Sequence, residues 1–211
     1  MSLTIELQKY ANASAQKIPQ EAQATMRQAI DDLVASDMLS KAFKTGDKLP
    51  EIRLSNAIGN IVNVHDILKQ NKVIIAFYRG NWCPYCNIQL RALQQAIPEF
   101  EAKEAKLVVI GPEAPDNSLT TKEKHELTFE VLSDIDNKVA RSLNLVYQLP
   151  EDLQKLYKQF GIDLDTNQGN ENQELPIAAT YVVAQDGTIS YHFLEEDYKL
   201  RADPQEILAA L

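Results

Sequence analysis

The chain has 211 residues, 45% of them hydrophobic and 24% charged, which excludes a disordered or fibrous protein and predicts one domain with room for an extension. Its formal net charge of -9 argues against nucleic acid or an anionic membrane as the main partner, because both select a cationic surface. The longest apolar run, Val73–Tyr78, is too short to cross a bilayer, and the first residues lack the pattern of a secretory signal, so we expect a cytoplasmic protein.

Residues 1–44 are predicted to form a helical N-terminal extension. They hold five acidic and five basic side chains and no glycine, and apolar residues at helical spacing predict an amphipathic helix over roughly 20–42, after a shorter helix that ends before Pro19. The turn-rich segment Thr45–Pro50 marks the boundary with an acidic body, residues 45–211. The extension packs either on this body or on a second subunit of a homodimer, and the sequence leaves both arrangements open.

The body alternates between strand and helix patterns. Strands are predicted at 72–79, 107–110 and 129–132, and a hairpin at 179–184 and 188–194 around the turn at Asp186-Gly187. Helices are predicted from Cys83 to about residue 96, ending before Pro98, and also near 120–126, 138–143 and 153–160 and after Pro204. This order predicts an α/β fold with a central mixed sheet flanked by helices.

The two cysteines of the chain, Cys83 and Cys86, lie where the first predicted strand leads into a helix. Pro84 suits the first helical position, which places Cys83 near the N-cap, beside free backbone N–H groups and the positive end of the helix. This environment favours a nucleophilic thiolate, so we expect the pKa of Cys83 to lie below that of a free cysteine. Cys86 follows one helical turn later, close enough to form a disulfide with Cys83.

Aromatic and basic residues surround this pair in the sequence. Trp82 and Tyr85 are expected to restrict access to the sulfur, and Arg79 is a candidate for positive charge beside it. Half a zinc site and an inert buried pair are the competing interpretations of Cys-x-x-Cys. We disfavour zinc because the three histidines are widely scattered, and we expect neither a metal nor another cofactor. Segment 163–174 nearly matches a calcium loop, but its glycine is displaced, which favours a flexible polar loop.

Three motifs together resemble one known family. They are Gly46-Asp47-x-x-Pro50, the run Phe77–Cys86 (FYRGNWCPYC), and Ala179–Val183 followed by Asp186-Gly187. Over about residues 45–211 the chain is similar to the peroxiredoxin-like branch of the alkyl hydroperoxide reductase and thiol-specific antioxidant family. The resemblance implies a thioredoxin fold, a peroxide substrate, and recycling by thioredoxin or by glutaredoxin and glutathione. It also implies that Cys83 is the peroxidatic cysteine and Cys86 the resolving one.

The chain departs from ordinary members of that family at positions that contact the peroxide. They place a proline seven residues and a threonine or serine three residues before the peroxidatic cysteine, where this chain has Ala76 and Gly80. Their arginine nine residues ahead of the turn glycine corresponds to Ala178. The usual hydroxyl and guanidinium are therefore missing, and Arg79 or Arg141 are the candidates to replace the guanidinium.

Three functional hypotheses follow. The favoured one is a peroxidase in which Cys83 attacks the peroxide and Cys86 resolves the product as a disulfide. The first alternative is a thioltransferase, in which Cys83 attacks a protein or glutathione mixed disulfide instead; the Cys-Pro-Tyr-Cys sequence is also similar to the glutaredoxin active site. The second is a redox-sensing interaction module in which the N-terminal helices dimerise and oxidation changes binding.

Overall fold

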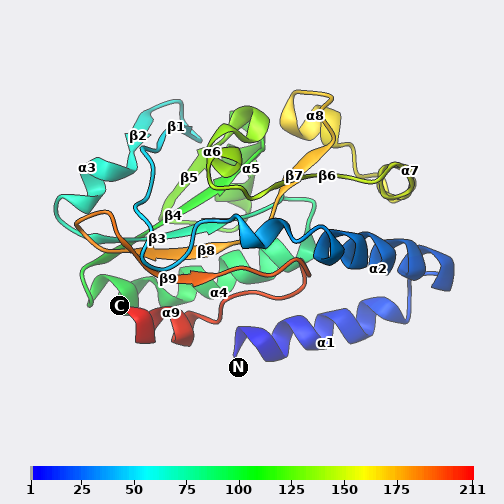
Figure 1. Ribbon diagram of the computed structural model, residues 1–211, viewed down its shortest axis with the longest axis horizontal. Helices are drawn as coiled ribbons and strands as arrows, with labels where there is room; N and C mark the ends of the chain where they lie inside the picture. Colours follow the sequence, from blue (N-terminus) through cyan, green and yellow to red (C-terminus); the bar gives the residue numbers. More distant parts are fainter. Residues whose placement is uncertain (1) are drawn as a thin grey trace.

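The computed structural model describes residues 2–211, and it shows a central sheet with helices on both faces (Figure 1). The sheet has seven strands in the order β2-β1-β5-β4-β3-β8-β9. β4 is parallel to β3 and β5, whereas the outer pairs are antiparallel, so the sheet is mixed, as the sequence predicts. The strands are β1 (Arg53–Asn56), β2 (Ile61–Asn63), β3 (Lys72–Phe77), β4 (Ala105–Gly111), β5 (Glu130–Ser133), β8 (Thr180–Val183) and β9 (Ile189–Phe193). A separate antiparallel pair joins β6 (Val146–Gln148) and β7 (Glu174–Pro176).

The continuous apolar run of β3 is explained by its central position. Because alternate side chains of a strand point to opposite faces, Ile74 and Ala76 enter one hydrophobic core, and Val73, Ile75 and Phe77 enter the other. All five side chains are buried. The end of β3, where the cysteine segment begins, therefore lies between the two buried cores of the molecule.

The helices cover both cores. The core of Ile74 is closed by α1, α4 and α9, and the core of Val73 by α3 and α6. The helices are α1 (Leu3–Ala15), α2 (Gln20–Ala35), α3 (Val64–Leu68), α4 (Pro84–Glu101), α5 (Pro115–Lys124), α6 (Lys138–Ser142), α7 (Glu151–Gln159), α8 (Leu164–Gln168) and α9 (Pro204–Ala210), with short 3-10 turns η1 (Met38–Ser40) and η2 (Ile135–Asn137).

The first two helices form what we call the N-terminal hairpin, residues 3–35, drawn in blue in Figure 1. Leu3 and Leu7 of α1 are buried in the core shared with α4, and Ala22 of α2 is buried against Leu153 and Leu156 of α7. Of the two arrangements that the sequence leaves open, the structure therefore shows packing on the body of the same chain.

The helix predicted over roughly 20–42 ends at Ala35 and is followed by the short turn η1. Two further differences from the sequence-based expectation have a clear physical reason. α4 continues through Pro98 and ends at Glu101, because Pro98 lies on the exposed side of the helix and the next turn buries Phe100 completely. Proline removes one hydrogen bond from a helix interior, and here the buried aromatic ring outweighs that loss. The calcium-like segment is not an irregular loop either, since it contains α8, whose N-cap Asp163 accepts a hydrogen bond from the backbone N–H of Thr166 (3.2 Å).

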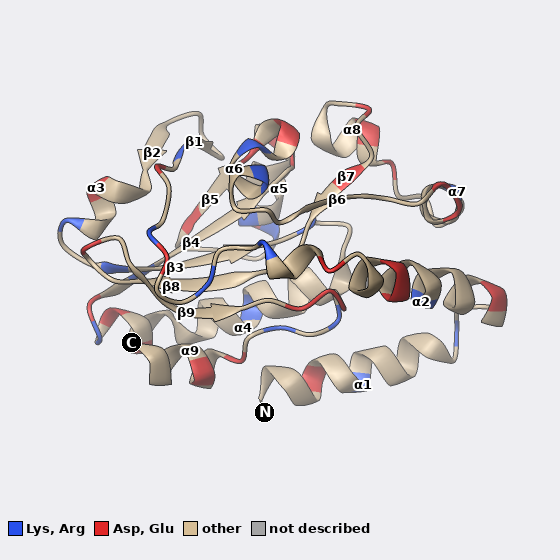
Figure 2. Cartoon of the chain, in the orientation of Figure 1, with Lys and Arg blue, Asp and Glu red and all other residues tan. Residues whose placement is uncertain are grey.

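Charged side chains of both signs are interspersed along the helices and loops (Figure 2). In the described part of the chain, no helix combines the length and the apolar character needed to span a membrane. Nor do residues 2–211 contain a group of three or more histidine, cysteine, aspartate or glutamate side chains arranged to hold a metal ion.

Candidate active site

The cysteine segment leaves β3 and enters α4 through a short loop, residues 78–82. Cys83 is the N-cap of α4, with an extended backbone (φ -89°, ψ 109°), and Pro84 occupies the first helical turn. The carbonyl of Cys83 accepts the first hydrogen bond of the helix from Asn87 N (3.1 Å). The position predicted for Cys83 at the start of the helix is therefore confirmed.

Gly80 makes this loop possible. Its φ of +149° is rarely adopted by residues with a side chain, and a Cβ built there lies only 2.3 Å from Nε1 of Trp82. The indole of Trp82 therefore fills the space that a side chain at position 80 would need. This explains in steric terms why the chain has glycine at this position.

The two cysteines are free thiols, hydrogen-bonded to each other and buried, with exposed fractions of 1% for Cys83 and 0% for Cys86. Sγ of Cys86 accepts hydrogen bonds from the backbone N–H of Arg79 (3.5 Å) and from Nη2 of Arg201 (3.4 Å). Sγ of Cys83 accepts one from Nη1 of Arg79 (3.8 Å). Two guanidinium groups therefore face one pair of sulfurs.

This arrangement corrects the expected acidity of Cys83. Burial raises the pKa of the Cys83 thiol, and the hydrogen bond with Cys86 and the negative charge there raise it further. Burial also acts to raise the pKa of Cys86, but the hydrogen bond from Cys83 and the two nearby guanidinium groups outweigh burial and hold that pKa well below its ordinary value. In the resting pair the proton therefore lies on Cys83 and the negative charge on Cys86. The expectation of a lowered pKa for Cys83 is wrong because it omitted burial and the hydrogen bond and negative charge of Cys86.

Arg79 lies inside a cage of aromatic rings. Its guanidinium carbon is 4.9 Å from the ring centre of Trp82, 4.3 Å from that of Tyr198 and 5.9 Å from that of Tyr157, and Nη2 donates to the Tyr157 hydroxyl. Only 2% of Arg79 is exposed. The cage fixes the guanidinium beside Cys83, so the structure places Arg79 where the sequence suggested positive charge.

Arg201 is a site residue that the sequence analysis missed. It lies between β9 and α9, is 4% exposed, and donates from Nε to Oε1 of Gln89 (2.8 Å) on α4. Nη1 donates to the carbonyl of Leu200 (2.8 Å). No local pattern marks this residue, because its partners come from a helix more than one hundred positions earlier in the chain.

A cavity of about 560 Å³ opens onto Cys83 from the side of the N-terminal hairpin. The body contributes Cys83 and all four of its predicted neighbours, Arg79, Trp82, Pro84 and Tyr85, whereas Cys86 does not line the cavity. The hairpin contributes Tyr10, Ala11, Asn12, Ser14, Ala15, Ile18, Gln23, Met26 and Arg27. The ring of Tyr85 lies edge-on between Tyr10 (5.1 Å) and Tyr198 (5.5 Å), so the hairpin directly contacts the aromatic residues around Cys83.

Glu113 is a second residue that sequence analysis missed. It is completely buried and accepts hydrogen bonds from the Tyr78 hydroxyl (2.6 Å), the backbone N–H of Asn81 (2.9 Å), Oγ1 of Thr121 (3.1 Å) and Nδ2 of Asn167 (2.9 Å). Two of these donors belong to the loop that carries Gly80. The carboxylate therefore fixes the loop between β3 and Cys83.

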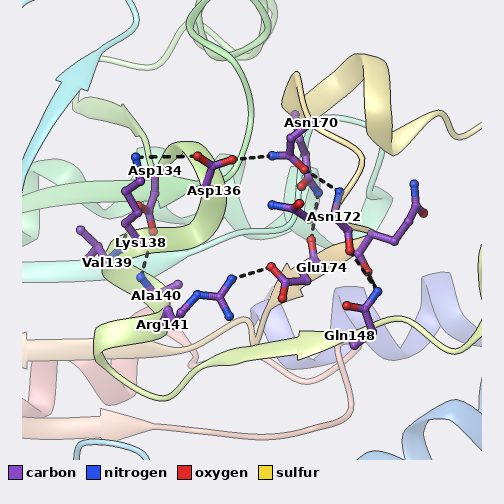
Figure 3. Close-up of polar contacts among 12 residues, drawn as sticks. Asp134, Asp136, Lys138, Val139, Ala140, Arg141, Gln148, Asn170, Asn172 and Glu174 are labelled. Atoms are coloured by element: carbon purple, nitrogen blue, oxygen red, sulfur yellow. Dashed lines mark hydrogen bonds and ion pairs between the residues drawn. The ribbon is translucent and has the colours of Figure 1, made fainter.

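Arg141, the other arginine considered from sequence, lies elsewhere. Its Nη2 pairs with Oε2 of Glu174 at 2.5 Å, next to a group of polar contacts that joins Asp136 to Asn170 (Figure 3). About half of the Arg141 side chain is exposed. It forms a surface ion pair, and Ala178 is a buried residue without a polar group, so Arg79 and Arg201 are the guanidiniums at the cysteines.

Comparisons with known proteins identify the family and the fold of the chain. Residues 45–192 match the model of the AhpC/TSA family. A putative peroxiredoxin of Buchnera aphidicola is 30% identical over 103 residues, 49% of this chain and 65% of the relative, and a putative peroxiredoxin of Mycobacterium tuberculosis is 33% identical over 94 residues, 44% of this chain and 59% of the relative. The chain thus spans less than two thirds of the length of these relatives.

Among solved structures, peroxidoxin BcpB of Mycobacterium tuberculosis superposes with a TM-score of 0.63 at 18% identity, covering 80% of this chain and 96% of that one. The bacterioferritin comigratory protein of Xanthomonas campestris gives 0.58 at 15% identity, covering 75% and 88%. The central mixed sheet flanked by helices is thus the thioredoxin fold. Because the family model covers most of the chain, including the cysteine segment, this protein belongs to the AhpC/TSA family.

Proposed function

We propose that this protein is a thiol-dependent peroxidase in which Cys83 attacks the peroxide and Cys86 resolves the product. The observation that carries the proposal is the different position of the two sulfurs: Cys83 lines the cavity, and Cys86 lies behind it, hydrogen-bonded to Cys83 and to Arg201. A peroxide that enters the cavity therefore meets Cys83 first. Membership of the AhpC/TSA family supports peroxide as the substrate.

The reaction starts with transfer of the Cys83 proton. The S–H of Cys83 is hydrogen-bonded to the Cys86 sulfur, so a proton that moves along this bond leaves a thiolate on Cys83, beside Nη1 of Arg79. That thiolate attacks one peroxide oxygen, an S–O bond forms and the O–O bond breaks. The peroxide proton stays on the oxygen bound to sulfur, so Cys83 becomes a sulfenic acid. The second oxygen takes the proton held by Cys86 and leaves as water or an alcohol, which returns Cys86 to the thiolate.

Resolution follows within the pair. The Cys86 thiolate attacks the Cys83 sulfenic sulfur, an S–S bond forms and the S–O bond breaks. The hydroxide that leaves takes a proton from solvent and becomes water. The charge of Arg201 favours the thiolate of Cys86 that makes this attack. A dithiol reductant, thioredoxin or glutaredoxin with glutathione, then restores both thiols. Residues 45–211 form the catalytic domain in this scheme, and the extension, residues 1–44, closes the cavity.

The test is consumption of hydrogen peroxide in the presence of a thioredoxin system. Wild type should consume peroxide faster than C83S, and C86S should accumulate a sulfenic acid on Cys83 that dimedone traps. R141M is the control variant and should consume peroxide at the wild-type rate, because Arg141 lies in a surface ion pair. Equal rates for wild type and C83S would refute the proposal.

A thioltransferase is the second candidate, and Gly80 is the observation that favours it. With the indole of Trp82 in the place of a side chain at position 80, the site lacks the hydroxyl that orients a peroxide in ordinary peroxiredoxins. A hydrogen bond of that kind is typically worth about a 100- to 1000-fold rate factor. Reduction of a glutathione mixed disulfide by wild type, with peroxide consumption equal to that of C83S, would select this candidate.

A further inference from the structure

Arg79 and Arg201 are buried cations without a carboxylate partner. Among residues 2–211, neither guanidinium lies within ion-pair distance of an aspartate or glutamate. A buried charge without a counter-charge is strongly destabilising, so a folded protein that holds two of them requires a source of negative charge nearby.

Among the described residues that contact the two guanidiniums, the cysteine sulfurs are the groups that can carry that negative charge. The remaining hydrogen-bond partners of the two guanidiniums are the Tyr157 hydroxyl, two backbone carbonyls and the side-chain amide oxygen of Gln89, which are neutral. Burial raises the pKa of Tyr157, so its hydroxyl stays protonated at neutral pH. Cys86 lies 3.4 Å from Arg201 Nη2, and Cys83 lies 3.8 Å from Arg79 Nη1.

We propose that the reduced Cys83–Cys86 pair is the counter-ion of Arg79 and Arg201, and that its disulfide is consequently a strong oxidant that passes its oxidising equivalents to a dithiol. The proposal rests on the disulfide of the proposed function and deepens it, because the two guanidiniums set how strongly this disulfide oxidises the dithiol that recycles it. The basis is electrostatic. A disulfide carries no charge, so its formation leaves both guanidiniums buried without a counter-ion, and the protein favours the reduced form.

The transfer step balances without another reagent. One thiolate of the substrate dithiol attacks Cys83, the sulfur that lines the cavity, and the Cys83–Cys86 bond breaks as a mixed disulfide forms. Cys86 leaves as a thiolate beside Arg201, which makes it a good leaving group. The second substrate thiol then attacks the mixed disulfide and releases Cys83. Two electrons pass from the substrate to the pair; one of the two thiol protons stays on Cys83 and the other goes to water.

The loop closed by the disulfide is too small to offset this effect. A cross-link stabilises a fold mainly by restricting the unfolded chain, and the gain falls with the length of the loop. Cys83 and Cys86 enclose only Pro84 and Tyr85. Oxidised protein should therefore melt at a lower temperature than reduced protein, the reverse of the usual effect of a disulfide.

The test is equilibration of the full chain with mixtures of reduced and oxidised glutathione, with the oxidised fraction measured by alkylation and mass spectrometry. Arg201→Met and Arg79→Met should each shift the equilibrium tenfold or more towards the disulfide, about 30 mV per factor of ten. Arg201→Lys, which keeps the charge, should lie nearer to wild type. Arg141→Met, the same change at a surface ion pair, should match wild type.

The difference in melting temperature between the reduced and the oxidised form of each variant is a second readout. A substitution that destabilises both forms equally leaves this difference unchanged. The reduced form should melt higher in wild type, and the difference should shrink or reverse in R201M. Equilibria within threefold of wild type for both methionine variants, or oxidised wild type melting above reduced, would overturn the proposal. Failure of wild type to form the disulfide with excess oxidant would overturn it as well. Peroxide consumption, measured in parallel, shows independently whether the peroxidase proposal holds.

Discussion

Nη2 of Arg201 lies 3.4 Å from Sγ of Cys86, although the two residues are 115 positions apart in the chain. The contact brings the segment after β9 onto the first turn of α4 and gives Cys86 a cation of its own. Arg79 serves Cys83 in the same way, through Nη1 at 3.8 Å. Each sulfur of the pair therefore has its own guanidinium, and the negative charge shared by the pair is held in place from two sides.

The first prediction concerns the pH dependence of the stability of the reduced protein. The folded pKa of Cys86 lies well below its unfolded value of about 8.5, so between these two values the unfolded chain binds more protons than the folded one. The free energy of unfolding should therefore rise with pH across this window. The gain is lost when the pH falls and Cys86 is protonated in the folded state. Denaturant unfolding at a series of pH values measures this slope.

C86S is the control for this measurement, because it keeps Cys83 and both arginines but lacks the acidic thiol. Above about pH 8.5 the sign reverses for Cys83, whose raised pKa keeps it protonated in the folded state after the unfolded chain has lost that proton. Stability should thus decline in that range in wild type. A slope below pH 8.5 that is the same in wild type and C86S would show that Cys86 is not the acidic group.

The second prediction concerns Gly80→Ala. A methyl group here lies 2.3 Å from Nε1 of Trp82 on a backbone with φ of +149°, so the change should cost roughly 2–4 kcal/mol in strain and overpacking. Trp82 is the single tryptophan of the chain, so its fluorescence reports displacement of the ring directly. Gly46→Ala is the control, because φ is +101° there but the space around the new methyl is open.

A loss of stability in G80A no larger than that in G46A, with unchanged tryptophan fluorescence, would contradict the steric explanation. The same geometry predicts that Gly80→Thr does not restore a peroxide-binding hydroxyl, because the indole occupies that space. Peroxide consumption by this variant should not exceed that of wild type.

The sequence predicted the parts of the site that depend on neighbours in the chain. The strand before the cysteines, the N-cap position of Cys83 and the proline after it all follow from local patterns. The structure confirms them, with the strand ending at Phe77 instead of residue 79. Arg79 lies four residues before Cys83, and its contact with the sulfur follows from that closeness. These features need no information about the rest of the fold.

The sequence could not predict contacts made by the tertiary fold. Arg201 and Glu113 reach the site from segments with no motif, and the burial of Cys83, which raises its pKa, comes from packing around the whole loop. The helix-end argument left out the burial of Cys83, and for this reason it predicted a lowered pKa where the pKa is raised. Pro98 is a similar case, because the buried ring of Phe100 decides where α4 ends.

The third prediction concerns Glu113→Gln. An amide can accept at one position only, so at least one of the four donors around this buried group loses its partner. We expect a loss of about 2–4 kcal/mol in the free energy of unfolding and slower reaction of Cys83, since the loop before it is released. Glu101→Gln, at an exposed pair with Lys106, should cost less than about 1 kcal/mol. Equal losses of unfolding free energy in both variants would show that Glu113 does not hold the loop in place.

The last prediction concerns the N-terminal hairpin as a wall of the cavity. Tyr10 of α1 contacts Tyr85 edge-on at 5.1 Å, and Met26 of α2 accepts a hydrogen bond from the Tyr198 hydroxyl (3.7 Å). Tyr10→Ala with Met26→Ala removes both contacts and opens the cavity towards solvent. Alkylation of Cys83 should then become faster, and more so for a bulky maleimide than for iodoacetamide, because the cavity limits the size of the reagent. Ile5→Ala, on the exposed side of α1, should leave both rates unchanged. A double variant that accelerates both reagents by the same factor would indicate loosening of the whole fold instead of removal of a wall.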